Sequence, residues 1–184
     1  MERPPERQRG PVAGGTTERS GDRTHTFTYD RVFHQDQGQE PVFDVAARDV
    51  VLSTLEGYNG TVSAYGQTGT GKTHTMEGTQ KPAQRGIIPR ACETIFGHID
   101  QAREEHGTDT FLVRVSFFQI YNERITDLLA PGAPDGMGRG GARNSGPGAA
   151  VTSLSIRQDG AGETYVDGLS EQIVKSPRDV QALL

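Results

Sequence analysis

Residues 66–73 carry the strongest chemical signal in the sequence. They read Gly-Gln-Thr-Gly-Thr-Gly-Lys-Thr and match the pattern G-x-x-x-x-G-K-[ST]. Glycines permit backbone angles that let amide N–H groups approach a phosphate closely. Lys72 supplies a charge that can reach the β- and γ-phosphates, and the Thr73 hydroxyl can ligate Mg²⁺. The residues predicted to hold a nucleoside triphosphate are Gly66, Gln67, Thr68, Gly69, Thr70, Gly71, Lys72 and Thr73.

The loop predicts that the chain binds a nucleoside triphosphate, but it does not show which reaction uses that nucleotide. A guanine-reading enzyme usually carries N-K-x-D, and the sequence contains no such motif. Hydrolysis also needs a second acidic ligand region and groups that position the attacking water. Glu123 ends an apolar run and could be such an acid, but we interpret it as a structural hydrogen-bonding residue. No catalytic residue is therefore assigned within the chain.

Segments before the loop show strand and helix patterns in turn. Residues 24–33 alternate in polarity and predict a short strand. Residues 39–57 place apolar side chains at helical spacing, and Gly57 is a natural stop just past the last turn. Residues 61–65 are β-prone and lie between an Asn-Gly pair and the loop, so they predict a buried strand.

Residues 85–107, after the loop, predict a helix with Pro89 in its first turn, where the missing N–H costs nothing. One apolar stripe runs along this helix, formed by Ala91, Ile95, Phe96, Ile99 and Ala102. Residues 111–123 are apolar on both faces of a strand pattern. They predict a central strand that is covered on both sides.

The last segments predict a hairpin and a helix. Residues 153–169 alternate around Asp159-Gly160, a pair typical of a hairpin turn. Residues 176–184 begin like a helix, with Ser176 as the cap, proline in the first turn and an acid near the positive end of the dipole.

Composition separates packed from unpacked segments. The chain is only 33% hydrophobic, with 24 glycines and no tryptophan, which is lean for a compact domain. Residues 1–23 are rich in Arg, Glu, Pro and Gly and predict a disordered leader. Residues 130–150 form a Gly/Pro-rich insert that predicts a flexible loop. We expect residues 24–184 to form one partial domain around this insert.

Charge and apolar content exclude several classes of protein. The net charge of −5 argues against general attraction to nucleic acid or anionic membrane. No run of 18 apolar residues occurs, so we expect no membrane insertion, and residues 1–15 have no apolar core typical of a signal peptide. Cys92 is the one cysteine, which favours a reducing compartment, and we interpret it as a small buried apolar residue.

Several long stretches, in order along the chain, resemble the kinesin motor domain. Residues 57–78, GYNGTVSAYGQTGTGKTHTMEG, resemble the phosphate-loop region of kinesin heads, with FTYDRVF before them and RGIIPR after them. Residues 115–129 and 154–177 also resemble this family. The resemblance implies an α/β fold of the phosphate-loop NTPase type, with a mixed sheet flanked by helices. We expect that fold to be incomplete here.

The resemblance implies ATP-driven movement along microtubules by a cytoplasmic, cytoskeleton-associated protein. ATP and Mg²⁺ would be the cofactors and tubulin the partner, whereas cargo and oligomeric state are left unspecified. The loop would bind the phosphates, Thr73 would ligate Mg²⁺, and His74 would stack on the adenine ring. Residues 157–165 resemble a loop that faces the microtubule, although Asp159 and Glu163 lie close to the only arginine there.

The sequence also departs from the family pattern. Residues 1–15 replace a first strand whose Arg and Pro would flank the adenine, and the switch sequences S-S-R-S-H and D-L-A-G-S-E do not occur. We therefore expect the 184 residues alone to be inactive in hydrolysis. Residues 61–65 would have no neighbouring strands, which would leave the isolated chain marginal or aggregation-prone.

Three hypotheses follow from these patterns. The first is part of a kinesin motor domain, with motor activity belonging to the complete protein. The alternative is a non-catalytic kinesin-like remnant that binds nucleotide or tubulin as a scaffold or regulator. The third is an unrelated phosphate-loop enzyme such as a small kinase, for which no lid or acceptor-binding acids are evident.

Overall fold

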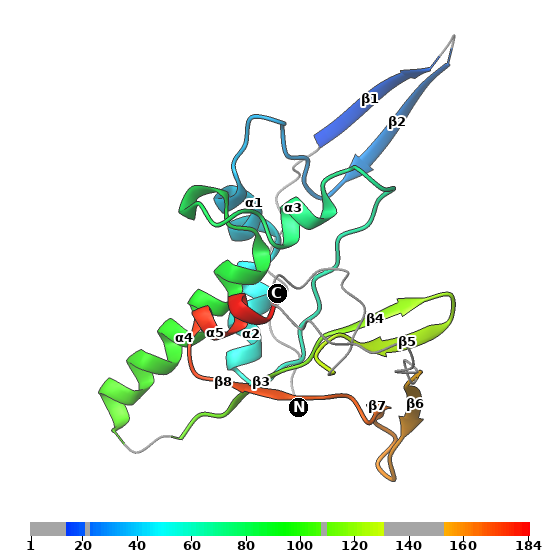
Figure 1. Cartoon of the computed structure of the whole chain (residues 1–184). Coiled ribbons are helices and arrows are strands. Elements are labelled where there is room, and N and C mark those ends of the chain that lie inside the picture. The colour runs from blue at the N-terminus through cyan, green and yellow to red at the C-terminus, as the bar shows by residue number, and fades with distance from the viewer. Residues whose placement is uncertain (1–13, 21–22, 108–109, 131–152) are drawn as a thin grey trace.

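The computed structural model describes residues 14–20, 23–107, 110–130 and 153–184, which form short helices and paired strands around one long helix (Figure 1). Its helices are α1 (Gln39–Ala46), α2 (Arg48–Leu55), α3 (Lys72–Met76), the 3₁₀ turn η1 (Pro82–Gln84), α4 (Ile87–His106) and α5 (Pro177–Leu183). Its strands are β1 (Gly14–Ser20), β2 (Arg23–Tyr29), β3 (Val113–Val115), β4 (Phe118–Tyr121), β5 (Arg124–Asp127), β6 (Ser155–Gln158), β7 (Thr164–Asp167) and β8 (Gln172–Val174). Most of the predicted insert at 130–150 lies outside the described residues.

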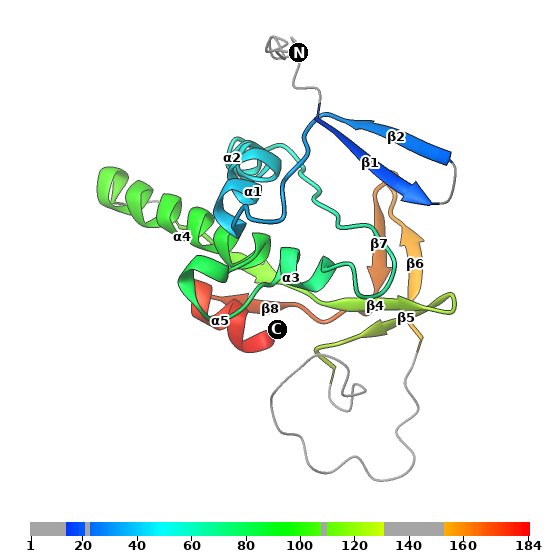
Figure 2. The same cartoon turned by 90° about the horizontal axis from the view of Figure 1, so that it is seen from above.

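Helix α4 is the element on which the core is built (Figure 2). One buried cluster joins it to α1 and α2 and contains Phe43, Ala47, Val51 and Ile87. A second cluster joins it to β8 and α5 and contains Phe96, Ile99, Val174 and Val180. Ile95 of α4 packs against both clusters, so the predicted helix and the Ile95, Phe96 and Ile99 part of its apolar stripe are confirmed.

The helix predicted over residues 39–57 is kinked at Ala47. The backbone there has φ −129° and ψ −29°, which divides α1 from α2. Hydrogen bonds still cross the kink, because Ala47 N–H donates to Phe43 O at 2.9 Å and Val51 N–H donates to Ala47 O at 2.9 Å. Phe43, Ala47 and Val51 are four residues apart and all buried, so the bend keeps one face against α4.

Gly57 ends α2 as the sequence predicts. Its φ of +94° lies in the left-handed region that favours glycine. Gly57 N–H donates to Thr54 O and Tyr58 N–H donates to Ser53 O, both at 3.1 Å. These two bonds are those of a Schellman motif and satisfy carbonyl groups left over at the helix end.

The described strands pair as four antiparallel two-stranded ladders: β1–β2, β3–β8, β4–β5 and β6–β7. An isolated bridge between Ile125 and Leu154 links β5 to the chain entering β6. Helices and strands therefore mix as the α/β class requires. The ladders do not join into one continuous sheet within the described residues, which agrees with an incomplete form of the fold.

The prediction of one covered strand over residues 111–123 is wrong. The chain changes its hydrogen-bonding partner near Ser116, from β8 for β3 to β5 for β4. All four residues of β4 are exposed, including Ile120 at 61%. The apolar pattern on both faces therefore does not correspond to burial on both faces.

The buried strand predicted at residues 61–65 is also corrected. The structure describes these residues, and none belongs to a strand. Val62 is half-buried against the first cluster, but Tyr65 is fully exposed. An extended segment needs neighbours for its backbone groups, and the described part of the chain pairs no strand with this one.

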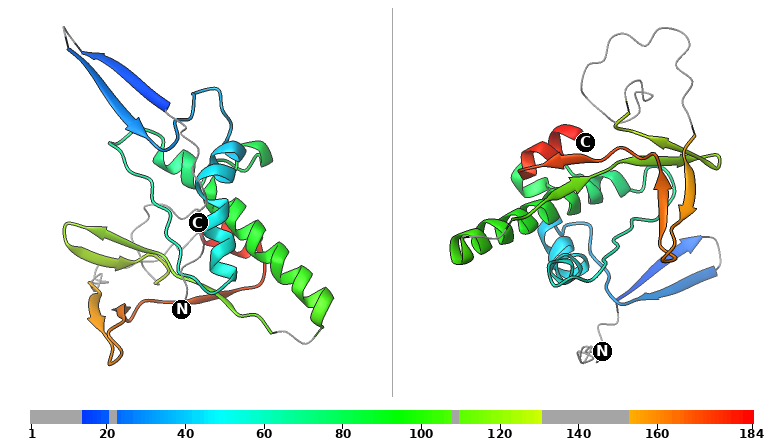
Figure 3. Two further views of the ribbon diagram at one scale, coloured as in Figure 1. Left: turned by 180° about the vertical axis from the view of Figure 1, so that it is seen from behind. Right: turned by 90° about the horizontal axis from the view of Figure 1, so that it is seen from below.

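The predicted leader is corrected for residues 14–20, whereas residues 1–13 lie outside the described residues. Gly14–Ser20 form β1, which pairs in register with β2, from Gly14 opposite Tyr29 to Ser20 opposite Arg23. The strand predicted from residue 24 thus gains a partner, and the hairpin projects from the body of the molecule (Figure 3). The leader's polar composition does not prevent this backbone pairing.

The two predicted C-terminal elements are confirmed. Strands β6 and β7 form the hairpin around Asp159-Gly160. Helix α5 begins at Pro177, and the Ser176 hydroxyl accepts a hydrogen bond from Asp179 N–H at 3.3 Å. The backbone N–H of Lys175 in turn donates to the Asp179 carboxylate at 2.7 Å and lowers its pKa from the ordinary value.

Candidate phosphate-binding site

The loop predicted to bind phosphates has the backbone shape its glycines were expected to allow. Gly66, Gly69 and Gly71 have φ values of +157°, +87° and +94°. A Cβ on Gly66 would lie 2.6 Å from Thr70 Oγ1, so the Thr70 hydroxyl would have to move, whereas a Cβ on Gly69 or Gly71 would meet nothing within 4 Å. The glycines therefore set the turn and leave one side of the loop open to a ligand.

Lys72 is folded back over the loop. Its ammonium donates to Gly66 O and to Gln67 O, each at 2.8 Å. The Thr70 hydroxyl also donates to Gln67 O, at 2.9 Å. The positive charge is thus held against the backbone carbonyl groups of the loop. Thr73 follows on the first turn of α3 and is exposed, so its hydroxyl is accessible to a metal ion.

The far end of α3 is fixed by the start of α4. Gly86 N–H donates to Glu77 O at 3.0 Å, and Thr79 N–H donates to Gln84 O at 2.9 Å. A Cβ on Gly86 would lie 2.6 Å from the carbonyl oxygens of both Thr75 and Met76. Only glycine allows this approach, so α3 is held closely against α4.

His74 is exposed on α3 and contacts a residue that the sequence analysis did not select. The side-chain Nε2 of Gln39 donates to His74 O at 2.5 Å and lies 3.1 Å from His74 Nδ1. Gln39 begins α1 and is only 7% exposed, which is unusual for glutamine. No local sequence pattern could have identified Gln39, because its partner lies 35 residues away.

Other predicted residues lie away from the loop. Glu123, interpreted as structural, lies with Asn122 in the tight turn between β4 and β5, where both have positive φ. Cys92 of α4 is partly buried against the second cluster. Burial, with a smaller contribution from the charge of Glu93, raises the pKa of its thiol, which agrees with an apolar packing role.

The hairpin predicted to face a partner carries little unpaired positive charge. Arg157 Nε forms an ion pair with Asp167 at 2.8 Å. Asp159 instead accepts from the N–H groups of Ala161 and Glu163, each at 2.8 Å, and so shapes the turn. The Asp159 carboxylate noted in the sequence therefore stabilises the turn of the hairpin itself.

Asp127 holds the strands near this hairpin together. Its carboxylate is buried and accepts from Leu129 N–H at 2.8 Å and from Ser170 N–H at 2.9 Å. Burial by itself raises the pKa of Asp127, but hydrogen bonds from Ser170, Leu129 and Ala130 outweigh it and hold the pKa below the ordinary value. The ionised form therefore stabilises the junction of β5 with the segment after β7.

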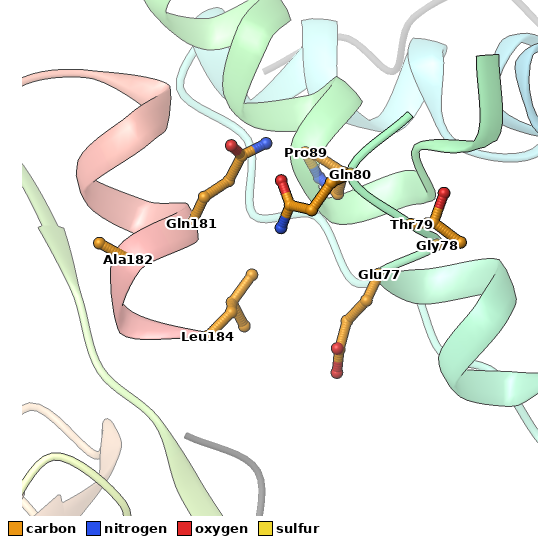
Figure 4. A pocket seen from close by; sticks show the side chains of 8 residues that line it. All are labelled: Glu77, Gly78, Thr79, Gln80, Pro89, Gln181, Ala182 and Leu184. Carbon is orange, nitrogen blue, oxygen red and sulfur yellow. The ribbon is translucent and has the colours of Figure 1, made fainter. Parts of the chain in front are cut away.

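A cavity of 670 Å³ lies at the end of α3 opposite the loop (Figure 4). It is lined by the segment after α3, the first turn of α4 and the end of α5, through Glu77, Gly78, Thr79, Gln80, Pro89, Gln181, Ala182 and Leu184. None of the predicted phosphate-binding residues lines it. The cavity and the phosphate loop are therefore separate features at opposite ends of one short helix.

The described residues contain neither a membrane-spanning helix nor a cluster of metal-binding side chains. None of the described helices is long and apolar enough to span a membrane. No group of three or more His, Cys, Asp or Glu side chains is placed there to hold a metal ion.

The loop geometry and Lys72 define a protein of the phosphate-loop class, and comparison with known proteins gives its family. A sequence profile of the kinesin motor domain matches residues 6–184. The chain therefore belongs to the kinesin motor domain family. The match begins at residue 6, whereas the sequence motifs that resemble kinesins begin near residue 24.

Curated relatives and a solved structure agree with this assignment. Kinesin-like protein klp-20 of Caenorhabditis elegans is 44% identical over 164 residues, which cover 89% of this chain and 22% of that protein. Kinesin-like protein KIN-5C of Arabidopsis thaliana is 39% identical over 168 residues, or 86% of this chain and 16% of that protein. The solved structure of a fast kinesin has a TM-score of 0.68 and 34% identity, covering 92% of this chain and 45% of that one. The chain thus spans less than half the length of each.

Proposed function

We propose that the loop Gly66–Thr73 binds the phosphates of Mg·ATP, and that the complete protein couples ATP hydrolysis to movement along microtubules. The observation that carries this proposal is the loop itself, which is open on one side while Lys72 Nζ lies 2.8 Å from two of its carbonyl oxygens. Membership of the kinesin motor domain family supports the motor role.

The residues present fit the nucleotide and its metal ion. Lys72 would exchange the carbonyls of Gly66 and Gln67 for phosphate oxygens, which carry full negative charge and form stronger hydrogen bonds. Thr73 would supply a hydroxyl ligand to Mg²⁺, and that ion would neutralise charge on the phosphates. His74, exposed two residues after Lys72, would stack on the adenine.

The wider role follows from the family. Tubulin is the proposed partner, and a cytoplasmic, microtubule-associated location goes with it. The 184 residues alone are proposed to bind nucleotide without coupled hydrolysis, because the switch sequences named above do not occur in them. Arg157, paired with Asp167, would contribute little to a contact with the acidic tubulin surface.

Titration calorimetry of the 184-residue chain with Mg·ATP tests the binding proposal. Loss of the charge-assisted bonds of Lys72 in Lys72→Ala should weaken ATP binding about 10- to 100-fold. Lys81→Ala, which removes an exposed lysine beyond α3, is the matched control and should bind as the unaltered chain does. Equal affinity in Lys72→Ala and the unaltered chain would refute the phosphate-loop assignment.

A further inference from the structure

Gln39 is a buried polar side chain that joins α1 to the phosphate-loop helix. It is 7% exposed, and its amide nitrogen lies 2.5 Å from His74 O, 3.1 Å from His74 Nδ1 and 3.4 Å from His74 Nε2. Figure 1 shows α1 and α3 side by side at this point. One side chain therefore contacts both the backbone and the ring of a single histidine.

The backbone contact satisfies a group that α3 leaves without a partner. The helix has five residues and ends at Met76, so its last carbonyl oxygens have no N–H donor within the helix. Thr73 O accepts from Glu77 N–H at 2.8 Å and from Gly78 N–H at 3.2 Å. His74 O accepts from Gln39 instead. A helix this short is marginal by itself, so such external bonds help to fix it.

The contact between Gln39 and the His74 ring restrains the orientation of that ring. His74 is exposed, and an exposed side chain on a helix samples several rotamers unless a neighbour restrains it. The buried amide of Gln39 is such a neighbour, because burial and the bond to His74 O hold it in one place. The ring of His74 is therefore restrained from beneath while its outer side stays open to a ligand.

We propose that Gln39 is a positioning residue that holds the His74 ring ready for the base of the nucleotide. The inference rests on the proposed function, since it takes the phosphates to lie at Lys72 and the base at His74. Gln39 acts through His74 and touches no part of the nucleotide. Its removal should therefore weaken recognition of the base more than recognition of the phosphates, which lose only the support that the bond to His74 O gives to α3.

Comparison of two ligands separates this role from a purely structural one. The Gln39→Leu variant removes the amide donor at similar size, and Gln35→Leu alters an exposed glutamine four residues earlier as the control. Calorimetry of the full chain would measure dissociation constants for Mg·ATP and for Mg·tripolyphosphate, which has no base. The ratio of the two constants is insensitive to the fraction of folded chain, since unfolding weakens both ligands alike.

The expected result is about fivefold weaker ATP binding in Gln39→Leu, as for loss of one hydrogen bond, with tripolyphosphate changed less than about twofold. In a His74→Ala background, Gln39→Leu should change ATP affinity less than about twofold, because the ring is already absent. The Gln35→Leu control should match the unaltered chain for both ligands.

Four results would overturn the inference. Equal weakening of both ligands would make Gln39 a helix cap only, and unchanged ATP affinity would remove any role. If the unaltered chain bound tripolyphosphate as tightly as ATP, the base would not be read at His74, although the phosphate loop would stand. Binding of neither ligand would instead refute the proposed function, and this inference with it.

Discussion

The two flanks of the phosphate loop are held in different ways. After the loop, α3 is fixed by Gln39 from α1 and by the close approach of Gly86 from α4. Before the loop, Gly60 lies close to Val50 and Thr54 of α2, and Val62 packs against the first core cluster, but Tyr65 is fully exposed. The same loop is therefore anchored on one side and loosely attached on the other.

The difference between the two flanks shows which interactions hold a segment in place in this chain. The anchored flank is a helix, whose backbone bonds are internal and whose remaining groups find partners on α1 and α4. The other flank is extended, and an extended segment satisfies its backbone only through neighbouring strands. Three predictions test how far this contrast extends, from the largest expected effect to the smallest.

Substitution Gly86→Ala should disrupt the anchored flank. Its backbone angles suit any residue, so the cost comes from a Cβ placed 2.6 Å from the carbonyl oxygens of Thr75 and Met76. We expect about 2–3 kcal/mol lower free energy of unfolding, from the forced separation of α3 and α4. Urea denaturation followed by circular dichroism measures it.

Gly97→Ala is the matched control on the same helix. A Cβ there meets nothing within 4 Å, and alanine favours a helix interior over glycine by up to about 1 kcal/mol. This variant should be slightly more stable than the unaltered chain. If Gly86→Ala were as stable as Gly97→Ala, the close contact between α3 and α4 would not exist.

Substitution Asp127→Asn should weaken the junction of β5 with the segment after β7. The neutral amide accepts less strongly from the N–H groups of Leu129 and Ser170, so we expect a loss of about 1–3 kcal/mol at pH 7. The folded-state pKa of Asp127 is below its unfolded value of about 3.9. Its stabilising effect is therefore complete above that value and is lost as pH falls through the folded pKa.

Denaturation at several pH values checks this prediction. The difference in free energy of unfolding between the two proteins should shrink below about pH 4, where Asp127 of the unfolded chain becomes protonated first and that of the folded chain follows at lower pH. Asp100→Asn, at an exposed position of α4, should change stability by less than about 0.5 kcal/mol. A pH-independent difference for Asp127→Asn would show that its charge is not what holds the junction.

Substitution Tyr65→Ser should have the smallest effect. The side chain is fully exposed on the loosely attached flank, so its removal costs no buried contact and should change stability by less than about 0.5 kcal/mol. Thermal unfolding followed by circular dichroism would measure the change. A loss above about 1 kcal/mol would mean that this flank is packed in solution, and the contrast between the flanks would fail.

The sequence predicted best those elements whose signals are local. The stop at Gly57, the cap at Ser176 and the hairpin around Asp159 each depend on residues within a few positions, and all three are present. Helix α4 was predicted from its apolar stripe, and the helical spacing of that stripe can be recognised within the segment itself.

The errors lie where a partner distant in the sequence decides the structure. Residues 111–123 have one strand pattern, yet the chain changes partner near Ser116. Residues 61–65 have a strand composition and no strand neighbour in the described chain. Gln39 belongs to the same class, because only the fold brings it to His74. Composition and periodicity contain no information on such distant pairings.

Hydrogen exchange with and without Mg·ATP tests the central claim most directly, since it reports on both flanks of the loop in one experiment. Residues 66–76 should exchange more slowly when Mg·ATP is present, while residues 60–65 should exchange quickly in both conditions. The slowing should disappear in Lys72→Ala. Unchanged exchange over residues 66–76, or equal slowing in Lys72→Ala, would contradict ATP binding at this loop.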